Sequence, residues 1–178
     1  MTSHSENIPK ILQAIDGVNP KRILDIGVGF GKFGLLAREQ YLSKKKEIEL
    51  IPINDIIIDC CEITEYFINL PYHNFLYDHH FHQSFFELKD KLKDVQYDLI
   101  LMIDVVEHYP KDEVKKWLRE VLQNKNKILI STPKEVVMYT QHYYGDPNHH
   151  KSQWTREDFN EFKNTDYSTD FSHIFLLG

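Results

Sequence analysis

The chain has 178 residues and a formal net charge of −6, with 42% of residues hydrophobic and 27% charged. This length suits one hydrophobic core, so we expect a single domain over residues 1–178. No apolar run approaches the ~20 residues of a membrane span, and the N-terminus does not read as a signal peptide, so we expect a cytoplasmic protein that does not bind membranes. The net acidity disfavours general binding to phosphate backbones, and the basic stretches 44–46 and 111–119 are interpreted as solvated surface.

Strand-like and helix-like stretches alternate, which is typical of a mostly parallel sheet covered by helices on both faces. In chain order, apolar runs predict strands at 22–26, 56–62, 81–84, 97–103 and 127–131, and two more within 167–177 that turn near Ser172 and His173. The patterns between them predict helices over 7–16, from the glycine-rich segment to about Tyr41, after Thr64, over 86–94, over 111–123 and over 155–162, the last with Thr155 and Asp158 as a capping pair. We therefore predict an α/β fold with one doubly wound, mostly parallel, seven-stranded sheet.

A glycine-rich segment, Asp25-Ile-Gly-Val-Gly-Phe-Gly-Lys-Phe-Gly, joins the first predicted strand to a helix. Its glycines let the backbone turn sharply and let a ligand approach without meeting a Cβ, and the helix that follows points free N–H groups at that ligand. A nucleoside-triphosphate loop is excluded, because Gly31-Lys32 precedes Phe33 and no glycine stands five residues before Gly31. A dinucleotide pattern fits residues 29–34, but it is short and permissive.

Asp25 separates the two remaining classes of ligand. A carboxylate at the end of the strand repels a diphosphate but attracts a cation, such as the amino group of a methionine moiety. The segment closely resembles the first motif of class I methyltransferases that use S-adenosyl-L-methionine (SAM), which is an acidic residue followed by x-Gly-x-Gly-x-Gly. The resemblance implies that Asp25, Gly27, Gly29 and Gly31 bind SAM, the glycines passing beneath its methionine and ribose portion.

Two later positions follow from the same resemblance. Glu62 ends the second predicted strand, where a carboxylate can accept both hydroxyls of a ribose; Asp59 competes for this role. After the third strand the family usually has an aspartate that contacts adenine. This chain has Ser84 there, which departs from the family pattern.

The strand at 97–103 ends in Asp104-Val-Val-Glu107-His108, and ligands of open α/β sheets bind beyond such strand ends. The sequence resembles the fourth methyltransferase motif, Asp/Glu-x-x-Glu-His, and the later His150-x-x-x-Trp-Thr stretch recurs in several branches. These branches include ubiquinone-type small-molecule O-methyltransferases and small-RNA 3′-end 2′-O-methyltransferases. The resemblance implies catalytic roles for Asp104, Glu107, His108 and His150, with Asp104 also near the cofactor.

In the RNA-modifying branch, such residues hold a divalent metal. Asp104, Glu107, His108 and His150 are therefore also candidate ligands of Mg²⁺ or Mn²⁺, with His108 or His150 as a metal-free general base in the alternative. Tyr143, Tyr144 and Trp154 are candidate walls of an acceptor pocket, and the cluster His79-His80-x-His82 is interpreted as a polar loop.

The sequence thus predicts a SAM-dependent methyltransferase acting on a hydroxyl, or another nucleophile, of a small metabolite or sugar. A metal-dependent RNA 3′-end 2′-O-methyltransferase is the main alternative. An NAD-dependent oxidoreductase and a non-catalytic SAM-binding subunit remain as alternatives from other classes. The sequence predicts neither the acceptor nor the oligomeric state.

Overall fold

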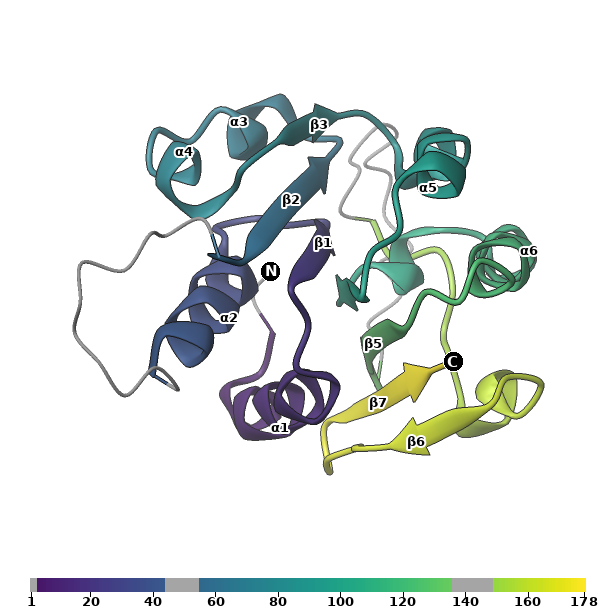
Figure 1. Cartoon of the computed structure of the whole chain (residues 1–178). Coiled ribbons are helices and arrows are strands. Elements are labelled where there is room, and N and C mark those ends of the chain that lie inside the picture. The colour runs from purple at the N-terminus through teal and green to yellow at the C-terminus, as the bar shows by residue number, and fades with distance from the viewer. Residues whose placement is uncertain (1–2, 44–54, 136–148) are drawn as a thin grey trace.

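The computed structural model of the protein describes residues 3–43, 55–135 and 149–178. Within these ranges, seven strands form one sheet in the order β3-β2-β1-β4-β5-β7-β6 (Figure 1). The neighbours among β1 to β5 are parallel, whereas β7 runs antiparallel to both β5 and β6. The predicted fold class is confirmed. The strands are β1 (Arg22–Ile26), β2 (Ile57–Glu62), β3 (His80–His82), β4 (Leu99–Ile103), β5 (Ile128–Pro133), β6 (Asn164–Asp166) and β7 (Ser172–Leu177).

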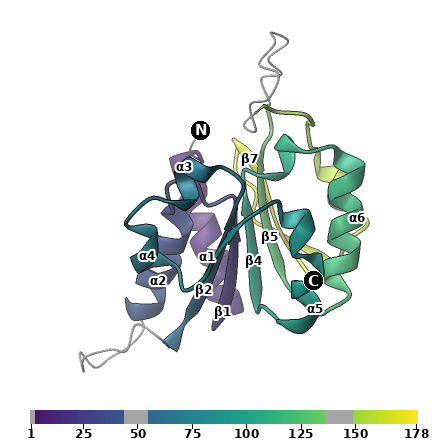
Figure 2. The same ribbon diagram turned by 90° about the horizontal axis from the view of Figure 1, so that it is seen from above.

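Helices cover both faces of the sheet. On one side lie α1 (Ile8–Val18), α2 (Lys32–Ser43), α3 (Glu65–Ile68) and α4 (His73–Leu76), and on the other lie α5 (Lys91–Asp94) and α6 (Lys111–Leu122) (Figure 2). Short 3₁₀ helices are η1 (Ser5–Asn7), η3 (Phe85–Lys89), η4 (Val106–His108) and η5 (Arg156–Phe159). None of the helices in the described ranges is long and apolar enough to cross a membrane.

The central strands bury both of their faces, which explains their continuous apolar sequences. Ile23 and Leu99 pack into the core beneath α1 and α2, while their neighbours Leu24 and Ile100 pack into the core beneath α6. This alternation follows from the two-residue period of a strand. The carboxyl ends of β1 and β4 are thereby held side by side on a rigid support.

The predicted turn near Ser172 and His173 is wrong, because both residues begin β7 and pair with β5. The chain turns between β6 and β7 instead, where polar side chains bond to the main chain. Asp166 accepts from the Ser168 amide, and Thr169 accepts from the Ser172 amide. Such side-chain bonds stabilise turns, and they leave the apolar alternation of 172–177 intact for the sheet.

Two helix predictions are also corrected. The stretch 155–162 forms only the 3₁₀ helix η5, although Thr155 and Asp158 do make the predicted capping box. The helix after Thr64 has four residues, and the Thr64 side chain makes no capping bond. Residues 44–54, between α2 and β2, lie outside the described residues.

Candidate active site

A cavity opens at the carboxyl ends of β1, β2 and β4. The chain leaves β1 toward β2 on one side and later returns to β4 on the other, so this is the point where the strand order reverses. Open α/β sheets bind ligands at such points, because the loops that follow the two strands diverge there. The lining combines the glycine turn with carboxylates, one ammonium group and aromatic rings. It includes Ser3, Gly27, Gly29, Phe30, Lys32, Glu62, Phe67, Gln83, Phe85, Asp104, His108 and Tyr109.

The three glycines of the turn each have positive φ, which side chains rarely adopt. A Cβ on Gly27 would lie 2.5 Å from a methyl of Val105, and one on Gly31 would lie 3.0 Å from Nε2 of His73. A Cβ on Gly29 would meet nothing within 4 Å. Gly27 and Gly31 are therefore required by packing, whereas Gly29 leaves room where the turn lines the cavity.

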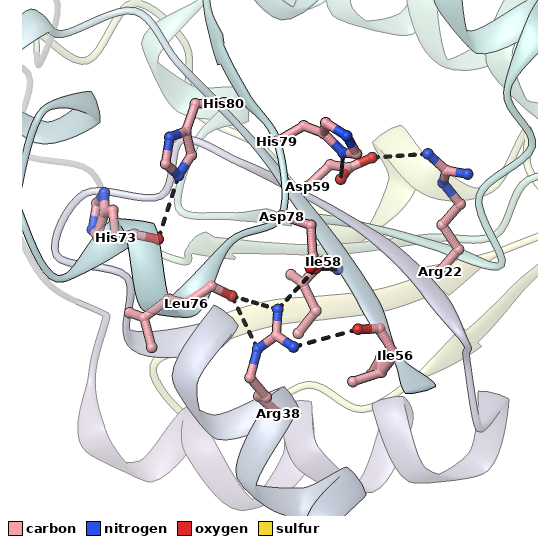
Figure 3. Close-up of polar contacts among 10 residues, drawn as sticks. All are labelled: Arg22, Arg38, Ile56, Ile58, Asp59, His73, Leu76, Asp78, His79 and His80. Atoms are coloured by element: carbon pink, nitrogen blue, oxygen red, sulfur yellow. Dashed lines mark hydrogen bonds and ion pairs between the residues drawn. The ribbon is translucent and has the colours of Figure 1, made fainter. Parts of the chain in front are cut away.

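Glu62 lines the cavity with its carboxylate held in place. One oxygen accepts from the Gly29 amide at 3.2 Å and the other from the Thr64 amide at 2.8 Å. The competing residue, Asp59, does not line the cavity. It is fully buried and accepts hydrogen bonds from Arg22 and His79 (Figure 3). It also accepts one from the Tyr97 hydroxyl.

Asp25 is not placed as the sequence suggested. Its carboxylate is 3% exposed, does not line the cavity, and accepts a 2.8 Å hydrogen bond from the Tyr77 hydroxyl. Burial raises its pKa to about 7, a hydrogen bond from Tyr77 opposes the rise, and the negative charge of Glu62 adds to it. Because successive strand residues alternate between the two faces of the sheet, Asp25 points away from the α6 side, where its neighbours Leu24 and Ile26 are buried, and toward the face covered by α2 and α4.

This burial predicts a pH dependence of stability. The folded state holds the Asp25 proton up to about pH 7, whereas the unfolded state releases it near 3.8, so the free energy of unfolding falls as pH rises between these values. In Asp25→Asn the fall from pH 5 to pH 8 should be smaller than in the natural protein by about 2 kcal/mol. Urea unfolding at both pH values measures it. Equal falls in the two proteins contradict the placement of Asp25.

Ser84 is committed to local structure. It forms the N-cap of η3 in a capping box with Glu87, and it is absent from the cavity lining, to which its neighbours Gln83 and Phe85 belong. The expected contact with adenine is therefore not provided by the Ser84 side chain. Any contact from this segment falls to Gln83 or Phe85.

Asp104, Lys32 and Ser3 line the cavity together. The Asp104 carboxylate accepts from the Ser131 hydroxyl at 3.1 Å and from the Ser3 hydroxyl. Lys32 Nζ donates to the carbonyl of Ser3 at 3.1 Å. Burial raises the pKa of Asp104, and these hydroxyls and the Lys32 charge oppose the rise. Ser3 thus supplies a hydrogen-bond partner to both the Asp104 carboxylate and the Lys32 ammonium group.

Glu107, His108 and His150 come together beside the cavity. One ligand atom from each lies within 4.8 Å of the others, and the ring centroids of His108 and His150 are 4.9 Å apart. The carbonyl of Glu107 accepts from the Lys151 and Ser152 amides, which fixes His150 against η4. Asp104 is not part of this group.

The polar atoms of this group are poorly satisfied. Oε2 of Glu107 and Nδ1 of His150 are buried without a hydrogen-bond partner. Burial raises the pKa of Glu107 to about 8, and the charge of Asp104 adds to the rise. Among the described residues, no other group of three His, Cys, Asp or Glu is arranged for a metal. The cluster of 79–82, interpreted from the sequence as a polar loop, instead contains the edge strand β3, because residues 80–82 pair with β2.

Several cavity residues were missed by the sequence analysis. Lys32 lines the cavity, although the sequence analysis used it only to exclude a nucleoside-triphosphate loop. Ser3 also lines the cavity, and it lies in a segment that contains no recognisable motif. Of the three predicted acceptor-pocket walls, Trp154 is instead fully buried in the core, where it packs on Phe159. Tyr143 and Tyr144 lie outside the described residues.

Comparison with known proteins places these features in context. A family model described as a methyltransferase domain matches residues 3–166. The bifunctional kinase-methyltransferase WbdD is similar in fold, with a TM-score of 0.62 at 16% identity over 99% of this chain, which spans 40% of the WbdD chain. The methyltransferase domain of bacterial CtHen1 is similar with a TM-score of 0.59 at 18% identity over 97% of both chains.

A third structure is that of a Nostoc punctiforme PCC 73102 protein assigned as an O-methyltransferase. Its TM-score is 0.60 at 14% identity, over 96% of this chain and 55% of that one. At these identities the structural likeness establishes the fold alone. No curated protein sequence matches the chain.

Proposed function

Since the chain belongs to the methyltransferase domain family, and so to the class I SAM-dependent methyltransferases, we propose that it methylates a hydroxyl of a small metabolite or sugar. The observation that supports this is one continuous cavity that runs from Glu62 past the glycine turn to His108. Glu62 is suited to a ribose diol, and His108 lines the same cavity as a group suited to an acceptor hydroxyl.

The described part of the cavity wall also suits the amino-acid end of SAM. Asp104 and Lys32 carry opposite charges, and both are bridged by Ser3, which offers a hydroxyl donor to one and a carbonyl acceptor to the other. A methionine moiety carries an ammonium donor and a carboxylate acceptor, so it can replace both contacts. Asp104, rather than Asp25, is then the carboxylate that contacts the ammonium group of SAM.

This assignment predicts a selective effect of Lys32→Met. Affinity for S-adenosylhomocysteine should fall about tenfold, because the variant loses the ion pair between Lys32 and the ligand carboxylate, worth roughly 1.4 kcal/mol. Affinity for 5′-methylthioadenosine, which lacks the amino-acid end, should stay within twofold. Lys32→Arg, which keeps the charge, is the matched control. Calorimetry with both ligands measures the split, and equal losses for the two ligands contradict the assignment.

The chemistry requires little more than alignment and one proton acceptor. The acceptor oxygen forms a bond to the methyl carbon as the bond from that carbon to the sulfonium sulfur breaks, and the hydroxyl proton passes to a base. His108 is the residue of the Glu107–His108–His150 group that lines the cavity, so we assign it this role.

The same group supports a second candidate, metal-dependent methylation of an RNA 3′ end. The orphaned atoms of Glu107 and His150 fit a divalent cation, and two imidazoles with one carboxylate favour Mn²⁺ over Mg²⁺, which prefers oxygen ligands. A bound metal would polarise the acceptor hydroxyl.

The charges of the described surface favour the small acceptor. Lys111, Lys115 and Arg119 of the basic helix α6 are neutralised by ion pairs with Asp158 and Glu161. Binding of a polyanion depends on free cationic groups, and on this helix only the exposed Lys116 makes no ion pair with a described residue, so α6 offers little free positive charge to RNA.

Methyl transfer from radiolabelled SAM tests the proposal. The purified protein, with and without Mn²⁺, is offered pools of phenolic and sugar metabolites and, separately, short RNAs. Label in the metabolite pools supports the proposal. Label confined to RNA, and dependent on Mn²⁺, establishes the second candidate instead.

A further inference from the structure

The residue assigned above as the proton acceptor, His108, is contacted by the main chain of a distant segment. Its Nδ1 lies 3.4 Å from the carbonyl oxygen of His149, which comes 41 residues later in the chain. A carbonyl oxygen can only accept a hydrogen bond, so Nδ1 is the nitrogen that carries the hydrogen in the neutral ring. The basic lone pair of His108 is then on Nε2, and Nε2 is the atom that can take a proton from an acceptor hydroxyl.

The carbonyl of His149 is held in place because its segment is hydrogen-bonded to the turn that carries His108. The carbonyl of Glu107, the residue before His108, accepts from the amides of Lys151 and Ser152 at 2.7 and 3.0 Å. These two bonds join main chain to main chain, so they form whichever side chains the segment carries. They bring the two segments together but leave the angle between them to be set by a further contact.

The Ser152 side chain supplies that contact, on the other side of His108 in the sequence. Its hydroxyl donates to the carbonyl of Tyr109 at 2.8 Å and accepts from the indole Nε1 of Trp154 at 3.0 Å. Ser152 is buried, and Trp154 is fully buried and packs on Phe159. The hydroxyl thereby connects the His108 turn to the hydrophobic core. Ser152 does not line the cavity, so it acts on a ligand only through other residues.

We propose that Ser152 is a positioning residue for methyl transfer: it keeps the His149 carbonyl at Nδ1 of His108, and that hydrogen bond keeps the lone pair of the ring on Nε2. The inference rests on the proposed function, in which His108 takes the proton of the acceptor hydroxyl. In that step the O–H bond breaks and its proton goes to Nε2. The oxygen forms its bond to the methyl carbon, and the sulfonium sulfur leaves with the electron pair of the carbon–sulfur bond. A neutral ring with its hydrogen on Nε2 has no lone pair there and takes no proton.

Ser152→Ala removes the hydroxyl and leaves the cavity wall unchanged. With the acceptor found by the radiolabel assay, kcat should fall about tenfold, while affinity for S-adenosylhomocysteine stays within twofold. Ser152→Thr, which keeps a hydroxyl on the same carbon, should restore at least half of the lost rate on a logarithmic scale. The control is Thr155→Ala, which removes the capping box of η5 and none of the contacts described above. It should lower Tm and leave kcat within twofold.

Spectra that correlate the ring hydrogens of histidines with their ¹⁵N nuclei give a readout that lost stability does not move. The ¹⁵N shifts of a neutral imidazole show which nitrogen carries the hydrogen, and at about pH 9 imidazoles are neutral. The signals of His108 are identified by their absence from His108→Ala. In the natural protein and in Ser152→Thr the hydrogen should be on Nδ1, and in Ser152→Ala the population should shift toward Nε2.

A hydrogen on Nε2 of His108 in the natural protein overturns the inference. So does an unchanged ring or an unchanged kcat in Ser152→Ala, and so does a fall in kcat that Thr155→Ala matches, since that is the result of lost stability. Failure of the natural protein to methylate any acceptor overturns the proposed function, and the catalytic role of Ser152 with it. The spectra need no acceptor, so they still decide whether Ser152 controls the contact between His149 and His108.

Discussion

Replacing Gly29 by valine should lower the affinity for S-adenosylhomocysteine at least 100-fold while the protein remains folded. Gly29 lines the cavity, its φ is +49°, and a Cβ there meets no protein atom within 4 Å. The protein itself therefore tolerates the added atoms sterically, but they stand in the space where the turn meets its ligand. The positive φ costs a β-branched residue roughly 1–2 kcal/mol, so Tm should fall by several degrees.

The control for this strain is Gly29→Ala, which also places a Cβ at positive φ but lacks the branched bulk of valine. It should show a smaller fall in Tm and a much smaller loss of affinity. Calorimetry on both variants, with circular dichroism to verify the fold, provides the measurement. A folded Gly29→Val protein that binds S-adenosylhomocysteine within threefold of the natural one would remove the glycine turn from the cofactor site.

The second large effect concerns His108. We expect His108→Ala to lower kcat by about 100-fold or more, the usual contribution of a positioned proton acceptor, while affinity for S-adenosylhomocysteine stays within threefold. The reason is placement. His108 lines the acceptor end of the cavity, whereas the groups suited to hold the cofactor, Glu62 and Lys32, lie elsewhere on the wall. Steady-state kinetics with the acceptor found above measures kcat and KM separately.

His150→Ala then distinguishes the two ways in which His108 can act. Its Nδ1 is buried without a partner, and its ring lies beside that of His108. A loss of kcat equal to that of His108→Ala, with loss of any Mn²⁺ stimulation, indicates a shared metal. A loss below tenfold indicates that His108 acts as a base by itself. Full activity in His108→Ala contradicts both.

The parts of the fold and site that could be predicted are those encoded locally. The buried strands β1 and β4 read as apolar runs because both faces of the sheet are covered, and the positive φ values of the turn require its glycines. The meeting of His108 and His150 was also predictable, since β4 and β5 are neighbours and their following loops emerge at the same edge of the sheet.

What could not be predicted depends on contacts between distant segments. The alternation of β1 turns Asp25 toward α2 and α4, but its partner there, the buried hydroxyl of Tyr77, comes 52 residues later, and no local pattern encodes that pairing. Ser3 meets Lys32 and Asp104 at the cavity although it lies 29 and 101 residues before them in the sequence, and no motif in its segment predicts those contacts. Ser84 was assigned by its place in a family pattern, whereas its capping box with Glu87 commits it to η3.

Titration calorimetry of the purified protein with S-adenosylhomocysteine, and in parallel with NAD, tests the central claim most directly. The cavity offers Glu62 to a ribose and the opposite charges of Lys32 and Asp104 to an amino acid, and a diphosphate would approach the Asp104 carboxylate unfavourably. We therefore predict saturable one-to-one binding of S-adenosylhomocysteine and no measurable heat with NAD. Binding of NAD without binding of S-adenosylhomocysteine would contradict the account.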